Sequence, residues 1–129
     1  MKVTKVNDVK GEDKSADTIF TGGTVKIQFL TGTGIPDQAK VPDPLSALQV
    51  NFSPGARTVF HTHDHPQILY VTKGKGIVAT EKEEIEVTAG TLVLFPAGEN
   101  HWHGAAKDSE FSHISITTPG KTTWEGKPS

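Results

Sequence analysis

Short runs that alternate apolar and polar residues, separated by Gly and Pro, constrain the fold of this chain more than any other feature. Residues 24–30, TVKIQFL, place three apolar side chains on one side of an extended segment and Lys and Gln on the other. Alternation with a period of two is typical of a strand with one buried face. No window of about 11 residues or more has a helical period. The chain is therefore predicted to be all-β, either a sandwich or a barrel.

Strand-like runs continue through the rest of the chain. Leu48, Val50 and Phe52 alternate with polar residues, and they are predicted to form either pocket walls or barrel core. The stretch Lys73–Gly76 is predicted to separate two strands, and the acidic run Glu81–Glu84 to be a solvated hairpin tip. Further strands are predicted at residues 57–63, 67–72, 77–80, 85–87, 91–95, 103–106 and 111–117.

The length of 129 residues fits one domain with one hydrophobic core. Pro36, Pro42 and Pro44 predict a loop after the first clear strand. The polar start of the chain is predicted to be an arm that pairs with another element or subunit. The end is polar except for Trp124, and we predict a loosely ordered tail in preference to docking of Trp124 on a partner subunit. The predicted parts are the arm, a barrel domain and the tail, at residues 1–20, 21–118 and 119–129.

Composition excludes several classes of site and partner. The chain has no Cys, which excludes disulfides, thiolate zinc sites and cysteine nucleophiles. Its net charge of -2 offers no electrostatic attraction for nucleic acid or an anionic membrane. No apolar stretch approaches the roughly 20 residues that span a bilayer, and the first residues lack the apolar region of a secretory signal. We therefore predict a soluble, cytoplasmic protein that acts on a small molecule.

The six histidines carry the strongest signal of chemistry. His61 and His63 are two residues apart, so on a strand both rings project from the same face. Gln67 starts the next predicted strand, and an antiparallel neighbour can return its side chain to the same centre. His101 follows the turn Pro96–Gly98, which can aim its ring inward. Three imidazoles and one amide oxygen suit a borderline divalent cation and leave positions open for water or substrate.

Other residues near this cluster allow two interpretations each. His65 is predicted to be solvent-exposed in a turn, with a ligand or a base at the pocket mouth as the alternative. His103 shares the face of His101 if the segment is extended, so a role in the pocket and simple packing are equally supported. Trp102 would lie on the opposite face, and it is predicted to pack in the core or in an interface. Arg57 shares a face with His61 by alternation, and it is either a cationic pocket rim or part of a surface salt bridge.

His113 lies in a strand whose other face carries two isoleucines, Ile114 and Ile116. The local pattern buries the isoleucines and leaves His113 in water. In a two-layered fold, however, both faces of a strand can be covered, one by the opposing sheet and one by a subunit.

The spacing of these residues resembles the two motifs of the cupin superfamily. The first motif, G-x5-H-x-H-x3-4-E-x6-G, is matched at every spacing by Gly55, His61, His63, Gln67 and Gly74. The second, G-x5-P-x-G-x2-H-x3-N, is matched by Gly90, Pro96, Gly98 and His101. This sequence departs from the motifs twice, with Gln67 in place of the Glu and Ala105 in place of the Asn. The resemblance implies a double-stranded β-helix, or jelly-roll, barrel with a metal ion inside.

A narrower resemblance involves residues 56–67 and 101–106 together with Phe20-Thr-Gly. These stretches look like the small bacterial cupins that act as manganese-dependent hydroxynitrile lyases, often labelled carboxymuconolactone-decarboxylase-like cupins. The resemblance implies one divalent ion, Mn first, with Fe, Ni, Zn and Cu as alternatives, and assembly as a homodimer or homotetramer. It also implies that the metal ligands are His61, His63, Gln67 and His101. It implies that His113 is a further histidine of the pocket.

Three functions follow as hypotheses. The first is a metal-dependent lyase of the hydroxynitrile type, in which His113, helped by His103, moves the proton. The second is dioxygen chemistry at Fe or Mn in the same site, and the third is a non-catalytic module that binds a metal or small ligand. Gln67 as a neutral ligand would leave the ion its full charge and favour anionic or dipolar oxygens, whereas a Gln67 that only fills space would leave three protein ligands.

Overall fold

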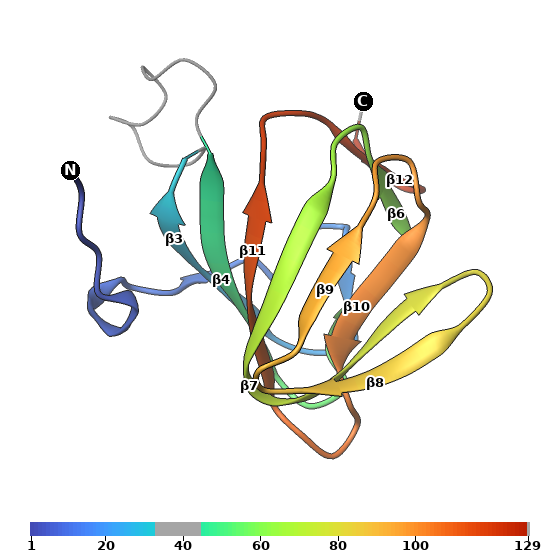
Figure 1. Ribbon diagram of the computed structural model, residues 1–129. Helices are drawn as coiled ribbons and strands as arrows, with labels where there is room; N and C mark the ends of the chain where they lie inside the picture. Colours follow the sequence, from blue (N-terminus) through green and yellow to red (C-terminus); the bar gives the residue numbers. More distant parts are fainter. Residues whose placement is uncertain (33–44, 129) are drawn as a thin grey trace.

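Almost all the regular secondary structure of the described residues is antiparallel strand (Figure 1). The computed structural model describes residues 1–32 and 45–128, so the loop predicted around Pro36, Pro42 and Pro44 lies outside the described residues. Within the described ranges the one helical element is a single 3₁₀ turn, η1 (Val6–Asp8), and no helix is long or apolar enough to cross a membrane. The strands are β1 (Glu12–Asp13), β2 (Phe20–Thr21), β3 (Val25–Thr31), β4 (Ser46–Phe52), β5 (Arg57–Thr58), β6 (His61–His63), β7 (Gln67–Thr80), β8 (Glu84–Thr88), β9 (Leu92–Phe95), β10 (His101–Ala105), β11 (Phe111–Thr117) and β12 (Thr122–Trp124).

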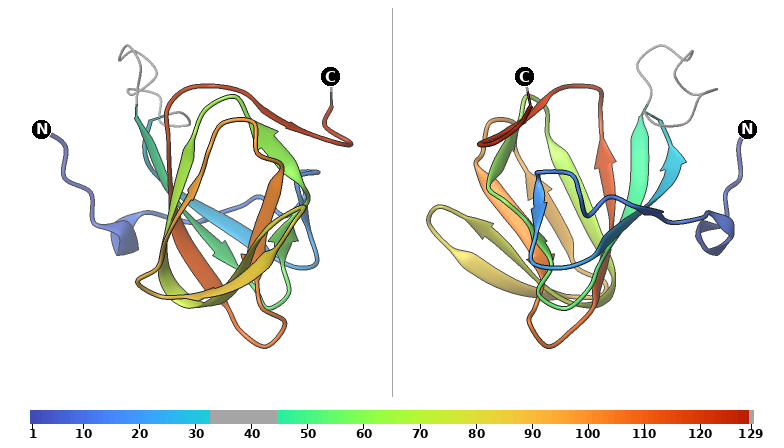
Figure 2. Two further views of the ribbon diagram at one scale, coloured as in Figure 1. Left: turned by 45° about the vertical axis from the view of Figure 1, so that its right-hand side comes forward. Right: turned by 180° about the vertical axis from the view of Figure 1, so that it is seen from behind.

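The strands form a sheet that curls on itself, so that its two halves face one another (Figure 2). Its hydrogen-bonded order is β1-β3-β4-β11-β7-β10-β5-β2, with β8 and β9 paired to β7 and with β6 between β10 and β12. The all-β prediction is confirmed, and the strands expected near residues 24–30, 85–87, 91–95 and 111–117 are present. The acidic run between β7 and β8 is exposed at the tip of their hairpin, as predicted.

The prediction that Lys73–Gly76 separates two strands is wrong, because β7 runs through this stretch without a break. The first half of β7 pairs with β11 and β9, and the second half pairs with β10 and β8. Gly74 has a φ of 75°, and a Cβ on it would overlap the backbone of Glu110. A Cβ on Gly76 would lie 2.5 Å from the ring of Phe111. The two glycines therefore mark the bend where one strand passes between the two halves, rather than a strand end.

The two ends of the chain join the sheet. Within the arm β1 pairs with β3, as predicted for pairing with another element. The prediction of a loosely ordered tail is wrong, because β12 pairs with β6. Trp124 contacts its own chain, where its indole Nε1 donates a hydrogen bond of 2.9 Å to the hydroxyl of Thr18. The run predicted over residues 57–63 is split into β5 and β6.

The core lies between the facing halves of the sheet. Val50 and Phe52 of β4 are buried there, as the core interpretation of this strand predicts, and Leu48 packs against them. Leu69 of β7 and Phe111 of β11 have no exposed surface. Each such side chain stabilises the fold by about 1.5–3 kcal/mol. Five of the six buried histidines, at positions 61, 63, 101, 103 and 113, fill the rest of this interior, so the apolar core directly adjoins a polar site.

Candidate metal centre

Three histidines from two paired strands meet inside the barrel. His61 and His63 project from β6, and His101 opens β10 directly opposite His61 in the antiparallel pair. A ring nitrogen from each of the three lies within 4.8 Å of the other two. All three side chains are buried. The group is therefore able to hold a metal ion through three imidazoles.

Backbone carbonyls select the tautomer of two of these rings. Nδ1 of His61 lies 2.8 Å from the carbonyl oxygen of Val59, and Nδ1 of His101 lies 2.8 Å from that of Glu99. A carbonyl can only accept a hydrogen bond, so both Nδ1 atoms carry the proton and the Nε2 atoms of the neutral rings keep a free lone pair. In both cases the carbonyl belongs to the residue two positions earlier in the chain.

Gln67 brings an oxygen to the same centre. Its Nε2 donates a hydrogen bond of 2.7 Å to the hydroxyl of Ser115, which fixes the orientation of the amide. Its Oε1 therefore lies 3.1 Å from Nε2 of His63 and 3.3 Å from Nε2 of His101. An amide oxygen facing an unprotonated ring nitrogen places two lone pairs together. Such an arrangement is stabilised by a cation between them, and three nitrogens with one oxygen are a donor set that borderline divalent ions accept.

The histidines of the cluster are neutral at pH 7. Burial, and the charge that a neighbouring imidazole would carry, lower the pKa of His61 and of His63 to about 4. Burial also lowers the pKa of His101 to about 4, although the hydrogen bond to Glu99 opposes the shift. Since only a neutral imidazole binds a metal, protons do not compete with an ion for this site near neutrality.

A second pair of histidines lies beside the cluster. Nδ1 of His103 is 3.1 Å from Nε2 of His113, so one shared proton joins the two rings. The ring of His103 is 5.4 Å from that of His61, and Phe52 packs against both His103 and His113. Burial lowers the pKa of His113 to about 3 and holds that of His103 well below its ordinary value. Among the described residues nothing hydrogen-bonds Nδ1 of His113.

The interpretation that leaves His113 in water is wrong, because its side chain has no exposed surface. β11 lies between β4 and β7, and its odd-numbered positions point into the barrel. The prediction of an exposed His65 is wrong for a related reason. Its ring stacks on His63 at 5.0 Å, and the returning tail covers it so closely that a Cβ on Gly120 would overlap the His65 ring.

Arg57 does not line the histidine pocket, so the cationic-rim interpretation is wrong. Its guanidinium lies 3.5 Å above the ring of Trp102 on the outer side of the sheet, and none of the described residues forms a salt bridge with it. The break between β5 and β6 resets the alternation, so Arg57 and His61 point to different faces. Trp102 is buried, in agreement with the packing predicted for it.

The structure also identifies supporting residues that sequence reasoning missed. Thr122 of β12 places its hydroxyl 2.8 Å from Nδ1 of His63. Thr58 accepts a hydrogen bond from the backbone N–H of His103, and the ring of Phe95 stacks on His101 at 3.8 Å. Ser115 shares a face with His113 by alternation, a signal visible in the sequence. Thr122 has no such signal, because it is 59 residues from its partner.

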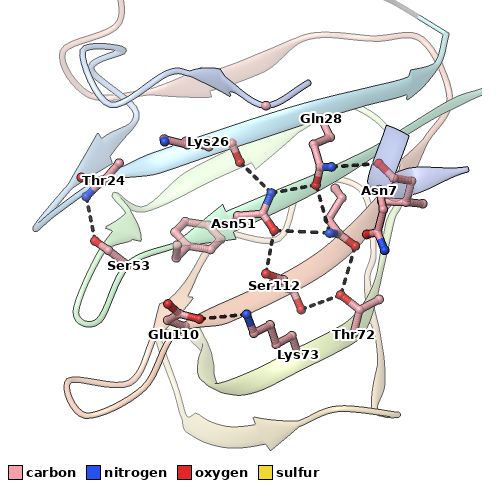
Figure 3. Close-up of a pocket in the computed structure, with 14 residues that line it drawn as sticks. Asn7, Thr24, Lys26, Gln28, Asn51, Ser53, Thr72, Lys73, Glu110 and Ser112 are labelled. Carbon is pink, nitrogen blue, oxygen red and sulfur yellow. Dashed lines mark hydrogen bonds and ion pairs between the residues drawn. The ribbon is translucent and has the colours of Figure 1, made fainter. Parts of the chain in front are cut away.

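A groove outside the barrel has no histidine in its lining. It has a volume of about 780 Å³ on the outer face of β3, β4 and β11 (Figure 3). Hydrogen bonds link the side chains of Gln28, Gln49, Asn51, Thr72 and Ser112 into one network across these strands, shown in Figure 3. We call these five side chains the amide network.

Comparison with known proteins gives consistent matches. The family described as "Cupin domain" matches residues 48–117. An (R)-mandelonitrile lyase from Granulicella tundricola is 41% identical over 117 residues, which cover 90% of this chain and 83% of that protein. A cupin-like protein from Thermotoga maritima is 35% identical, with a TM-score of 0.78 over 92% of this chain and 86% of that chain. The polyketide cyclase RemF from Streptomyces resistomycificus shares the fold, with a TM-score of 0.77 and 21% identity. The match covers 96% of this chain and 86% of that chain.

Proposed function

Because the chain belongs to the cupin superfamily, we propose that it is a metal-dependent lyase that cleaves and forms the cyanohydrins of small aldehydes. The observation that carries the proposal is the interior with five histidines, three beside an amide oxygen and two more paired next to them. The relative named as an (R)-mandelonitrile lyase suggests the substrate class, since mandelonitrile is the cyanohydrin of benzaldehyde.

His61, His63, His101 and Gln67 would hold one divalent ion, Mn in the first instance. An ion held there supplies a Lewis acid for the hydroxyl or carbonyl oxygen of the substrate. None of these four side chains can contribute a negative charge, because a neutral imidazole and an amide are both uncharged ligands. The site therefore favours oxygens that carry negative or strongly dipolar charge, and a Glu in place of Gln67 would weaken this preference.

His103 and His113 would handle the proton. In cleavage, the hydroxyl of the cyanohydrin loses its proton, the carbon–carbon bond to cyanide breaks, and the cyanide leaves with that proton as HCN. A neutral imidazole can accept the proton and return it. His103 adjoins the ring of His61, and its Nδ1 shares one proton with Nε2 of His113. Burial excludes water, which would otherwise compete for the same proton.

The test begins with protein purified without a histidine tag. Elemental analysis is expected to find about one divalent ion per chain, and the loaded protein is expected to release benzaldehyde and cyanide from mandelonitrile. Removal of the ion with a chelator should abolish release, and Mn²⁺ should restore it. Oxygen consumption without cyanide release, or bound metal without either reaction, would contradict the lyase proposal and support the dioxygenase or the binding module.

A further inference from the structure

The histidine site is closed to solvent in the folded chain. None of the proposed ligands, and neither of the two paired histidines beside them, is more than 9% exposed, and His101 and His113 have no exposed surface. The walls around them are hydrogen-bonded strands, with β10 between β6 and β7 and with β11 between β4 and β7. An ion or a substrate therefore reaches the centre only when a covering segment moves.

One connection crosses the end of the barrel at this site. Residues 118–121 link β11 to β12, and in Figures 1 and 2 they run past the turn between β6 and β7. β11 ends at Thr117, directly opposite Gln67, and β12 begins at Thr122, directly opposite His63. The connection therefore starts beside one proposed ligand and ends beside another. We call residues 118–121 the strap.

The strap is fastened through a single residue, Asp64. The backbone N–H of Lys121 donates a hydrogen bond of 2.7 Å to Oδ1 of Asp64, and the N–H of Asp64 donates one of 3.1 Å to the carbonyl oxygen of Lys121. Among the described residues no other hydrogen bond holds the strap. Each strand of the site is instead paired along its length. Of the described walls, the strap is therefore the one whose opening requires the least free energy.

The strap lies directly on the ring of His65. Nδ1 of His65 is 3.1 Å from the carbonyl oxygen of Pro66, so Nδ1 carries the proton and Nε2 keeps a lone pair. A Cβ on Gly120 would overlap the His65 ring and the Asp64 carboxylate, and it would lie 3.1 Å from that Nε2. His65 in turn stacks on His63 at 5.0 Å. The path from solvent beneath Gly120 therefore leads over His65 to a proposed ligand.

We propose that the strap is a gate, and that ions and substrates reach the histidines when its hydrogen bonds to Asp64 break. The closed strap excludes water from the site, and the open strap uncovers Nε2 of His65 and the ring of His63 behind it. The proposal concerns the site of the proposed function. Two of its three readouts, however, need neither a bound metal nor a reaction.

Asp64→Ala tests the gate, because it removes the acceptor for the N–H of Lys121. Diethylpyrocarbonate acylates unprotonated imidazole nitrogens, and mass spectrometry gives its rate of reaction with each histidine. Hydrogen exchange measures the protection of the Lys121 amide. The His65 and Lys121 rates should both rise about 10–100-fold, the effect of losing one hydrogen bond to a charged group. Release of Mn²⁺ from the loaded protein to a chelator should accelerate by a similar factor.

Gly120→Ala is a second, independent substitution. Its methyl group would overlap Asp64 and His65, so it should push the strap outward and raise the same three rates. Gly11→Ala is its matched control, because a Cβ there meets only ordinary contacts, the nearest at 3.6 Å from Cβ of Lys26.

Asp64→Asn is the matched control for Asp64→Ala. It removes the same charge but keeps an oxygen that accepts the bond, so its rates should stay within about 5-fold of the wild type. The buried His113 reports unfolding of the whole chain, and its modification should not accelerate in any folded variant.

Wild-type rates for His65 and Lys121 in Asp64→Ala would overturn the proposal. So would faster modification of His65 with unchanged release of Mn²⁺, because the strap would then open without controlling access. A protein that binds no Mn²⁺ would contradict the proposed function instead, and the His65 and Lys121 rates would still decide whether the strap opens.

Discussion

At the scale of single residues, the orientation of one amide determines what the site can bind. Gln67 has an oxygen and a nitrogen on the same group, and only the oxygen can act as a ligand. The hydrogen bond from its Nε2 to Ser115 turns the oxygen toward His63 and His101. The hydroxyl of Ser115 thus decides whether the cluster has three donors or four.

Ser115→Ala is expected to weaken Mn²⁺ binding by about 10–100-fold, the usual cost of losing a partner that orients a ligand. The physical reason is that the amide of Gln67 loses its anchor and can turn its nitrogen toward the ion. Calorimetric titration of metal-free protein measures the change. Ser112→Ala is the control, because Ser112 lies on the same strand and bonds Asn51 on the outer face instead. Equal affinities for the two variants would contradict this role of Ser115.

His113→Ala is expected to lower cyanohydrin turnover by roughly 10²–10⁴-fold, the range for a positioned proton-transfer group. Metal content should stay near that of the wild type, because His113 is not among the proposed ligands. His101→Ala should instead lower metal content and turnover together. Steady-state kinetics and elemental analysis of the two variants, with His113→Gln to preserve side-chain volume, separate the roles. Turnover like that of the wild type at full metal loading would remove His113 from the reaction.

At the scale of elements, β12 supports a strand that carries two members of the cluster. It pairs with β6 through Thr122 opposite His63 and Trp124 opposite His61. The segment that leads into β12 covers His65 at Gly120, and β12 itself supplies the hydroxyl of Thr122 that contacts His63. The end of the chain is thus part of the centre, although its own sequence is short and polar.

Thr122→Val is expected to weaken metal binding by roughly 10-fold, because it removes the hydrogen-bond partner of His63 while keeping the shape of the side chain. Thr123→Val is the matched control, since the exposed Thr123 lies on the same strand and faces away. Titration with Mn²⁺ and the melting temperature of each variant measure the effect. The interpretation fails if the two substitutions change the affinity equally.

Considered as a whole, the molecule couples its stability to pH through five of its six buried histidines, those whose pKa burial lowers. In the unfolded chain a histidine titrates near pH 6.5, whereas in the folded protein the pKa values of His61, His63 and His101 lie near 4 and that of His113 near 3. Between these values the unfolded state binds more protons than the folded state. Stability therefore falls as the pH is lowered from about 6.5 toward 4, and it is fully present above this range.

The metal-free protein is accordingly expected to lose on the order of 10 °C or more of melting temperature per pH unit below about pH 6.5, since each of the five histidines contributes up to about 1.4 kcal/mol per unit. Thermal unfolding followed by circular dichroism at pH 7, 6 and 5 measures the slope. His113→Phe should make the dependence of melting temperature on pH shallower, because one titrating group is lost. A melting temperature that does not change over this range would contradict the linkage.

Features that depend on near neighbours along the chain could be predicted from the amino-acid sequence alone. Alternation defines most strands, because a period of two decides which side chains meet the core. The cluster of His61, His63 and Gln67 is equally local, since its members lie within one strand and the start of the next. His101 could be predicted as a ligand from the second motif, because the turn of that motif lies shortly before it in the chain.

Features that depend on contacts between distant segments could be seen only in the folded chain. The pairing of β12 with β6, the burial of His65 beneath Gly120 and the hydrogen bond from Thr122 to His63 all join residues more than 50 positions apart. The direction of Arg57 and the continuity of β7 through its glycines likewise follow from how the two halves of the sheet face each other. Local patterns report which side chains can be buried, but the closure of the sheet determines which of them are and what they then contact.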